Sequence, residues 1–218
     1  MKPCEIRDLL SQASTARERF PAGIHTFALY WIAWEAYRTR MLAVAMRFHG
    51  WSIKDAYFAI GAKRISSQRR YTECFQAITG IDLSQQKGGI GKAWTNLNAL
   101  ESLRHRLVHG YRGADPILMR DAITFLDCVL TNHEHIFGKL TIMPEKQSIH
   151  LGNALAQRPA AGRRIAICKE RQDLIELLRL NAAVPGKVPG SEVQKSLRRF
   201  VEEIAPYDSG NPACPPKA

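Results

Sequence analysis

One short segment of the chain combines residue types that suit phosphodiester chemistry. Residues 103–110 read LRHRLVHG, which places Arg104 five positions before His109. A histidine exchanges protons near neutral pH, and a guanidinium can bind a phosphate and stabilise the charge that develops during reaction. RNA supplies its own nucleophile, the 2′-hydroxyl. The pair therefore predicts metal-free cleavage of RNA, without a cofactor.

The elements around this pair predict that it lies at the end of a helix. Leucines recur at helical spacing over residues 93–109, and Gly110 is a typical stop. Five residues at ~100° each put Arg104 and His109 ~140° apart on an ideal helix. The two can still converge, because arginine is long and His109 occupies the last helical position.

Helical periodicity dominates the first two thirds of the chain, and alternating strand patterns are scarce. We expect an all-α helical bundle. The other predicted helices cover 5–19, 24–48, a short one from the N-cap Ser52 to 59, 64–79 ended by Gly80, and 115–137 begun by Asp115-Pro116. The polar, glycine-rich residues 85–91 predict a loop. The tryptophans are expected in the core.

The composition changes after Pro144. Two candidate helices, 171–181 and 192–204, are separated by segments rich in proline and glycine, and residues 164–168 could form a short strand. We therefore expect a helical domain over residues 1–143. A partly helical C-terminal extension with a frayed end is expected over residues 144–218.

The overall charge and cysteine content narrow the class of protein. There are 31 Lys and Arg against 20 Asp and Glu, a net charge of +11, and the excess is spread along the chain. A basic surface attracts nucleic acid, although it equally suits an acidic protein. Five scattered cysteines favour a reducing cytoplasm over a disulfide framework. The most apolar stretch, 27–48, carries four charges, which argues against a membrane span.

Three other patterns suggest different chemistry. His105 and His109 have the i, i+4 spacing of a zinc site, but Arg106 occupies the position of the glutamate in a zinc-protease helix and would repel a cation. Residues 87–92 superficially resemble a phosphate loop without its spacing, and a connector is the simpler interpretation. The His133-Glu134-His135 run is interpreted as a solvated helix end, because i, i+2 side chains diverge. We expect no metal.

The segment 104–109 resembles the motif of HEPN ribonucleases. That motif has an arginine, usually a polar residue next, and a histidine after four to six intervening residues; many HEPN toxins end it as Leu-Val-His-Gly, as residues 107–110 do. The flanking helices and the aromatic helix around residues 30–36 are also similar to the family. The resemblance covers roughly residues 5–140 and leaves the C-terminal third unexplained.

The resemblance implies a homodimeric, metal-independent endoribonuclease with Arg104 and His109 as catalytic residues. In several members an acidic residue of the early helix approaches the pair, and Glu35 is the matching position. Toxin–antitoxin and phage-defence roles are common in the family, so an antitoxin or regulatory protein is a further expected partner. Beside the motif, His105, Arg106 and Arg112 are candidates for RNA binding.

Two alternatives stay open on the residues alone. Glu35 could be a buried salt-bridge partner of Arg38 or Arg104 rather than an active-site group. The whole chain could be a non-catalytic helical module that dimerises or binds a nucleic acid or a partner protein, since some HEPN proteins have lost catalysis.

Overall fold

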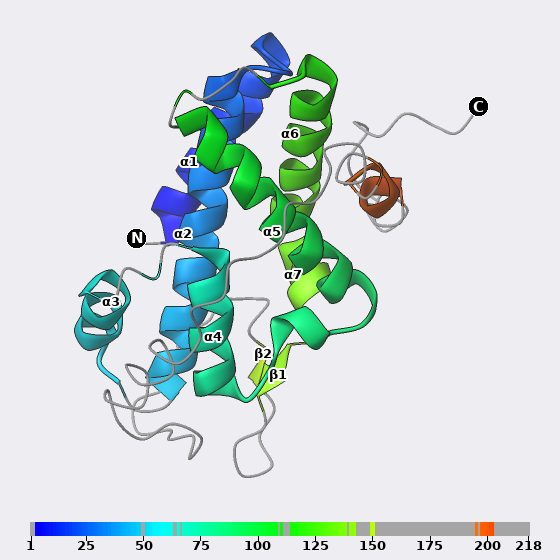
Figure 1. Ribbon diagram of the computed structural model, residues 1–218. Helices are drawn as coiled ribbons and strands as arrows, with labels where there is room; N and C mark the ends of the chain where they lie inside the picture. The colour runs from blue at the N-terminus through cyan, green and yellow to red at the C-terminus, as the bar shows by residue number, and fades with distance from the viewer. Residues whose placement is uncertain are drawn as a thin grey trace.

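The fold is all-α, with one pair of two-residue strands (Figure 1). The computed structural model describes residues 3–48, 51–62, 65, 67–108, 110, 114–138, 140–142, 149–150, 195 and 197–202. The helices are α1 (Pro3–Arg19), α2 (Ile24–Phe48), α3 (Ile53–Ala62), α4 (Gln68–Thr79), η1 (Leu83–Gln85), α5 (Gly88–Val108), α6 (Pro116–Thr131) and α7 (His133–Phe137). Strands β1 (Thr141–Ile142) and β2 (Ile149–His150) pair antiparallel.

Helix α2 is the centre of the bundle. It packs against α1, α3, α4, α5 and α6, and Figure 1 shows it running between them. Its bounds are those expected from the sequence. Because partners surround α2, its apolar residues cover most of its circumference rather than one narrow stripe.

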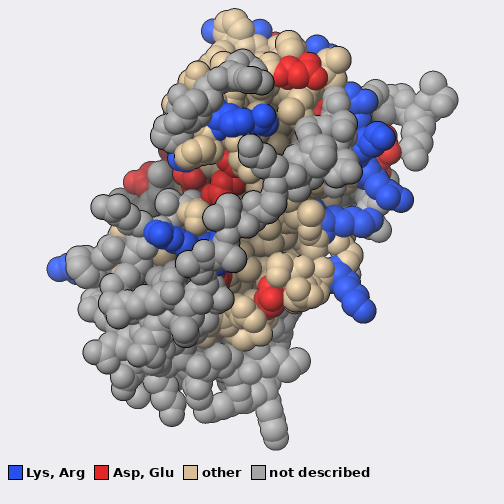
Figure 2. Space-filling view, in the orientation of Figure 1, with Lys and Arg blue, Asp and Glu red and all other residues tan. Residues whose placement is uncertain are grey.

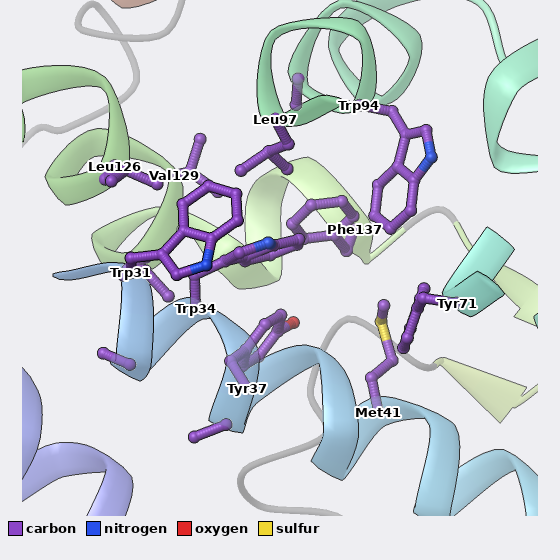
Figure 3. Close-up of a cluster of buried hydrophobic side chains, with 14 of the residues drawn as sticks. Trp31, Trp34, Tyr37, Met41, Tyr71, Trp94, Leu97, Leu126, Val129 and Phe137 are labelled. Carbon is purple, nitrogen blue, oxygen red and sulfur yellow. The ribbon is translucent and has the colours of Figure 1, made fainter. Parts of the chain in front are cut away.

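Aromatic side chains of α2, α4, α5 and α7 gather in the core, where Leu126 and Val129 of α6 lie with them (Figure 3). Trp34 of α2 is fully buried, stacks on Phe137 of α7 and meets Trp94 of α5 edge to face, each with ring centroids 5.9 Å apart. Tyr71 of α4 and Phe125 of α6 are buried as well. The expectation that tryptophans build the core is confirmed for Trp31, Trp34 and Trp94; Trp51 is partly buried against it.

The expected loop over residues 85–91 is wrong. Residues Leu83–Gln85 form a 3-10 turn, and α5 already begins at Gly88. Gly91 permits a close backbone approach, because a Cβ there would lie 1.9 Å from the backbone oxygen of Gln86. Ile90, between the glycines, is buried. This turn therefore supports the first turn of α5.

Other predicted helices differ in extent, and α3 continues to Ala62 instead of ending at residue 59. The helix expected from residue 64 begins at Gln68, where the side chain of Ser67 accepts a hydrogen bond from the Arg70 amide. The helix expected over 115–137 is divided into α6 and α7. Both the backbone and the side-chain amide of Asn132 donate to the carbonyl of Cys128, which ends α6.

The C-terminal residues described, 195 and 197–202, are helical and lie against α6 (Figure 1). Leu197 and Phe200 are buried, and the Phe200 ring packs edge to face on Phe125 of α6. Arg198 pairs with Asp121 of α6 at 2.8 Å. The helix expected at 192–204 is confirmed over these residues. The helix expected at 171–181 and the strand at 164–168 lie outside the described residues.

The surface in Figure 2 carries both signs of charge. Lysine and arginine side chains follow the right-hand edge of this face, on the side where Figure 1 places α6 and the C-terminal helical segment. Acidic side chains are more scattered. Among the described helices, none is long and apolar enough to cross a membrane.

Candidate active site

Arg104 lies one turn before the end of α5. Leu97, Leu100 and Leu103 are buried, and they fix the orientation of this helix against the core. The side chain of Arg104 follows Leu103 at the border of the buried face and keeps 37% of its area exposed. As its spacing predicts, the stem of this arginine borders the core while its guanidinium reaches the surface.

Glu35 of α2 faces Arg104 across the helix pair. Its Oε1 lies 3.8 Å from an Nη of Arg104 and 3.7 Å from an Nη of Arg38. The same oxygen accepts a 2.8 Å hydrogen bond from the indole N–H of Trp31. The structure thus brings Glu35 to both arginines that sequence analysis considered for it. The separations from the arginines are too long for hydrogen bonds, so Glu35 does not use up the N–H donors of Arg104.

Arg38 is the buried member of this group, with only 1% of its side chain exposed. It donates to Oε1 of Gln68, which also accepts a 3.3 Å hydrogen bond from the Trp34 indole. Its guanidinium lies over the ring of Tyr71, 5.6 Å from the centroid. Burial lowers the pKa of Arg38, whereas the nearby carboxylates of Glu35 and Glu101 act to raise it.

Glu101 is a site residue that sequence analysis missed. It precedes Arg104 by one turn on α5, and its Oε1 accepts a 2.8 Å hydrogen bond from the backbone N–H of Gln68, the first residue of α4. Burial raises its pKa, although that hydrogen bond and the charge of Arg38 act to lower it. The sequence signal was present: both α2 and α5 carry Glu-x-x-Arg, as Glu35–Arg38 and Glu101–Arg104.

Of the remaining predicted site residues, the structure describes His105 and Arg106. His105 and Arg106 are exposed in the last turn of α5, and Arg106 is two positions from Arg104, so the two point in different directions. His109 and Arg112 lie outside the described residues. Gly110 has a φ of 66°, the left-handed conformation expected of a glycine after a helix.

Comparisons with known proteins gave no match. Neither protein-family models, nor curated proteins, nor solved structures match the chain. The chemistry of the site must therefore be argued from its residues: a partly exposed guanidinium, a carboxylate beside it, and a buried arginine behind that carboxylate. Such a group can bind an anion at the surface. In the described part of the chain, no three His, Cys, Asp or Glu side chains are grouped as metal ligands.

The expectation of a solvated helix end at residues 133–135 is wrong for His133. Its ring stacks on the buried Tyr37, with centroids 5.0 Å apart and planes 8° from parallel. Its Nδ1 is buried without a hydrogen-bond partner among the described residues. Burial lowers the pKa of His133 below its ordinary value of 6.5; Glu134 acts against this shift and Arg7 adds to it.

We expect this histidine to make stability depend on pH. Because the unfolded chain binds its proton at a higher pH than the folded protein, the free energy of unfolding should decrease as pH falls through about 6.5 towards the lower folded pKa. Urea unfolding of wild type and His133→Phe at about pH 7.5 and about pH 5 measures this contribution. The variant, which keeps a ring on Tyr37, should lose less stability than wild type. An equal loss in both proteins would contradict the assignment.

Proposed function

We propose that this protein is a metal-independent endoribonuclease of the HEPN type. The observation that carries the proposal is the position of Arg104, the first residue of the Arg104–His109 motif. Its side chain is partly exposed beside Glu35, near the end of α5. In this proposal Arg104 binds the scissile phosphate, His109 transfers protons, and Glu35 orients Arg104. The exposed His105 and Arg106, together with Arg112, bind neighbouring phosphates of the RNA.

The proposed reaction is a transesterification within the RNA backbone. The 2′-oxygen forms a bond to phosphorus as the bond from phosphorus to the 5′-oxygen breaks. The 2′-hydroxyl loses its proton and the departing 5′-oxygen gains one, and His109 mediates this exchange. Arg104 stabilises the added negative charge on the phosphoryl oxygens through charge-assisted hydrogen bonds. The products are a 2′,3′-cyclic phosphate and a free 5′-hydroxyl.

We also infer that the protein acts as a homodimer. Val108 and Ile117, on either side of the α5–α6 connection, keep 62% and 51% of their area exposed. Large apolar side chains in such a position favour a protein contact next to the motif. A toxin or phage-defence role in the cytoplasm, held in check by an antitoxin or another regulatory protein, is the biological setting that we propose for this activity.

The test is cleavage of a mixed RNA substrate in EDTA, with the chemical nature of the new ends determined. We expect cutting that continues in chelator and leaves cyclic phosphate ends. RNA of the same sequence with 2′-O-methyl groups throughout should resist, because its nucleophile is blocked. Cleavage of the methylated strand, or activity that requires an added metal, would contradict the mechanism. Stable binding of RNA without cleavage would support the non-catalytic module instead.

A further inference from the structure

Arg38, Glu35 and Arg104 lie in series between the core and the surface. Helices α2 and α5 each contribute one Glu-x-x-Arg pair, Glu35–Arg38 and Glu101–Arg104. The exposed fraction of the side chain increases from 1% for Arg38 to 29% for Glu35 and 37% for Arg104. Glu35 therefore stands between a buried arginine and a surface arginine, at nearly equal distances from both.

The position of Arg38 is set by uncharged groups. Its hydrogen bond to Gln68 is reinforced by the Trp34 indole, which donates to the same amide oxygen, and its guanidinium rests over the Tyr71 ring. These residues are themselves buried. Arg38 consequently cannot move away from Glu35 without breaking contacts in the core.

The burial of Arg38 is not explained by a gain in folding stability. Replacing buried ion pairs by apolar residues is often neutral or stabilising, because the charges have to be desolvated. Methionine or leucine could take the place of the Arg38 stem among these buried side chains, although the hydrogen bond to Gln68 would be lost. What an apolar residue could not supply is a fixed positive charge 3.7 Å from Glu35.

We propose that Arg38 is a positioning residue: by sharing the charge of Glu35, it keeps the guanidinium of Arg104 available for an RNA phosphate. The ligand in this inference rests on the proposed function. Without Arg38, the full charge of Glu35 would attract Arg104, and the two would close from 3.8 Å into a hydrogen-bonded pair. RNA would then have to compete with Glu35 for the donors of Arg104.

The competition predicts a specific pattern in RNA binding. Affinity is measured by fluorescence anisotropy with a short 2′-O-methyl RNA, which remains intact during the measurement. Arg38→Met should weaken binding roughly tenfold, the value of one charge-assisted hydrogen bond. Because the competitor is then absent, Arg38→Met should have less than about a twofold effect in a Glu35→Gln background. In cleavage assays the same single substitution should raise KM more than it lowers kcat.

Matched variants separate positioning from folding. Arg17→Met removes an arginine from another partly buried ion pair, with Asp127, that joins α1 to α6. It should leave RNA affinity unchanged. Arg38→Lys retains a charge but not the planar contact with Tyr71 and Gln68. If Arg38→Met does not fold, Arg38→Lys replaces it, and RNA affinity is again compared in the wild-type and Glu35→Gln backgrounds. The loss of affinity should be smaller for Arg38→Lys, and it should again vanish with Glu35→Gln.

The outcomes distinguish this inference from the proposed function. A loss of affinity that persists undiminished in the Glu35→Gln background would mean that Arg38 acts only on the fold, and would overturn the inference. RNA cleavage with an affinity that does not depend on Arg38 would also overturn it, while the nuclease assignment stands. If Arg38→Met weakens RNA binding only when Glu35 is present, and no RNA is cleaved, the role of Arg38 is supported and the nuclease is rejected. A wild-type protein that neither binds nor cleaves RNA would reject both.

Discussion

Arg104→Ala is expected to reduce the rate of RNA cleavage by about 10²–10³-fold, the usual effect of removing one donor that stabilises a developing oxyanion. The Arg104 side chain is more than one third exposed and makes no hydrogen bond to Glu35, so its loss should barely change the fold. His109→Ala should have an effect of about 10²–10⁴-fold, because proton transfer then depends on water. Single-turnover cleavage in EDTA measures both rates.

An arginine outside the site provides the control for this experiment. Arg120 is exposed on α6, and Arg120→Ala changes the net charge by the same amount as Arg104→Ala. We expect it to cleave at nearly the wild-type rate, which would separate the role of Arg104 from that of overall charge. Circular dichroism and unfolding curves verify that each variant is folded. Wild-type cleavage by both Arg104→Ala and His109→Ala would place the activity elsewhere and refute the proposed site.

The largest expected effect on stability belongs to Trp34→Ala. Trp34 is fully buried, packs on Phe137, Trp94 and Tyr37, and donates a hydrogen bond to Gln68. Removing a buried aromatic side chain typically costs about 3–5 kcal/mol through lost burial and the cavity left behind. That is a large part of the roughly 5–15 kcal/mol that stabilises a whole domain. Urea unfolding followed by circular dichroism measures the loss.

Ile32 on the same helix gives the matched comparison. It lies two residues before Trp34, but 45% of its area is exposed. Ile32→Ala should change the free energy of unfolding by only about 0.5 kcal/mol, as is usual for surface positions. If the two substitutions had similar effects, the core drawn in Figure 3 would not be the source of stability.

The sequence was most informative where a pattern is local. The bounds of α2 and the end of α4 at Gly80 follow from periodicity and helix stops, and both agree with the structure. The start of α5 was missed because glycines usually indicate a loop. Here Gly91 is needed for a close approach to the backbone oxygen of Gln86, which the residue types alone do not show. The break at Asn132 was missed as well, because it depends on a hydrogen bond from the Asn132 side chain to the carbonyl of Cys128.

In the candidate site, too, some features could be predicted from the sequence and others could not. Arg104 and Glu35 could be selected individually from the motif and the aromatic helix. The burial of Arg38 could not, because its partner Gln68 lies 30 residues away and Glu101 lies farther still along the chain. A charged residue on a helix is normally assigned to the solvated face. Only the packing of α4 against α2 and α5 places an amide and an aromatic ring around it.

The docking of residues 195 and 197–202 on α6 depends on an uncut chain. Burial of Leu197 and Phe200 is worth about 1.5–3 kcal/mol each, and the exposed Arg198–Asp121 pair adds about 0–1 kcal/mol. Bringing two separate molecules together costs about 4–15 kcal/mol. As a free peptide this helix would bind α6 weakly, whereas the backbone that joins them supplies a high effective concentration. A proteolytic cut between His150 and Lys195 would therefore release the helix from α6, although every contact residue remained intact.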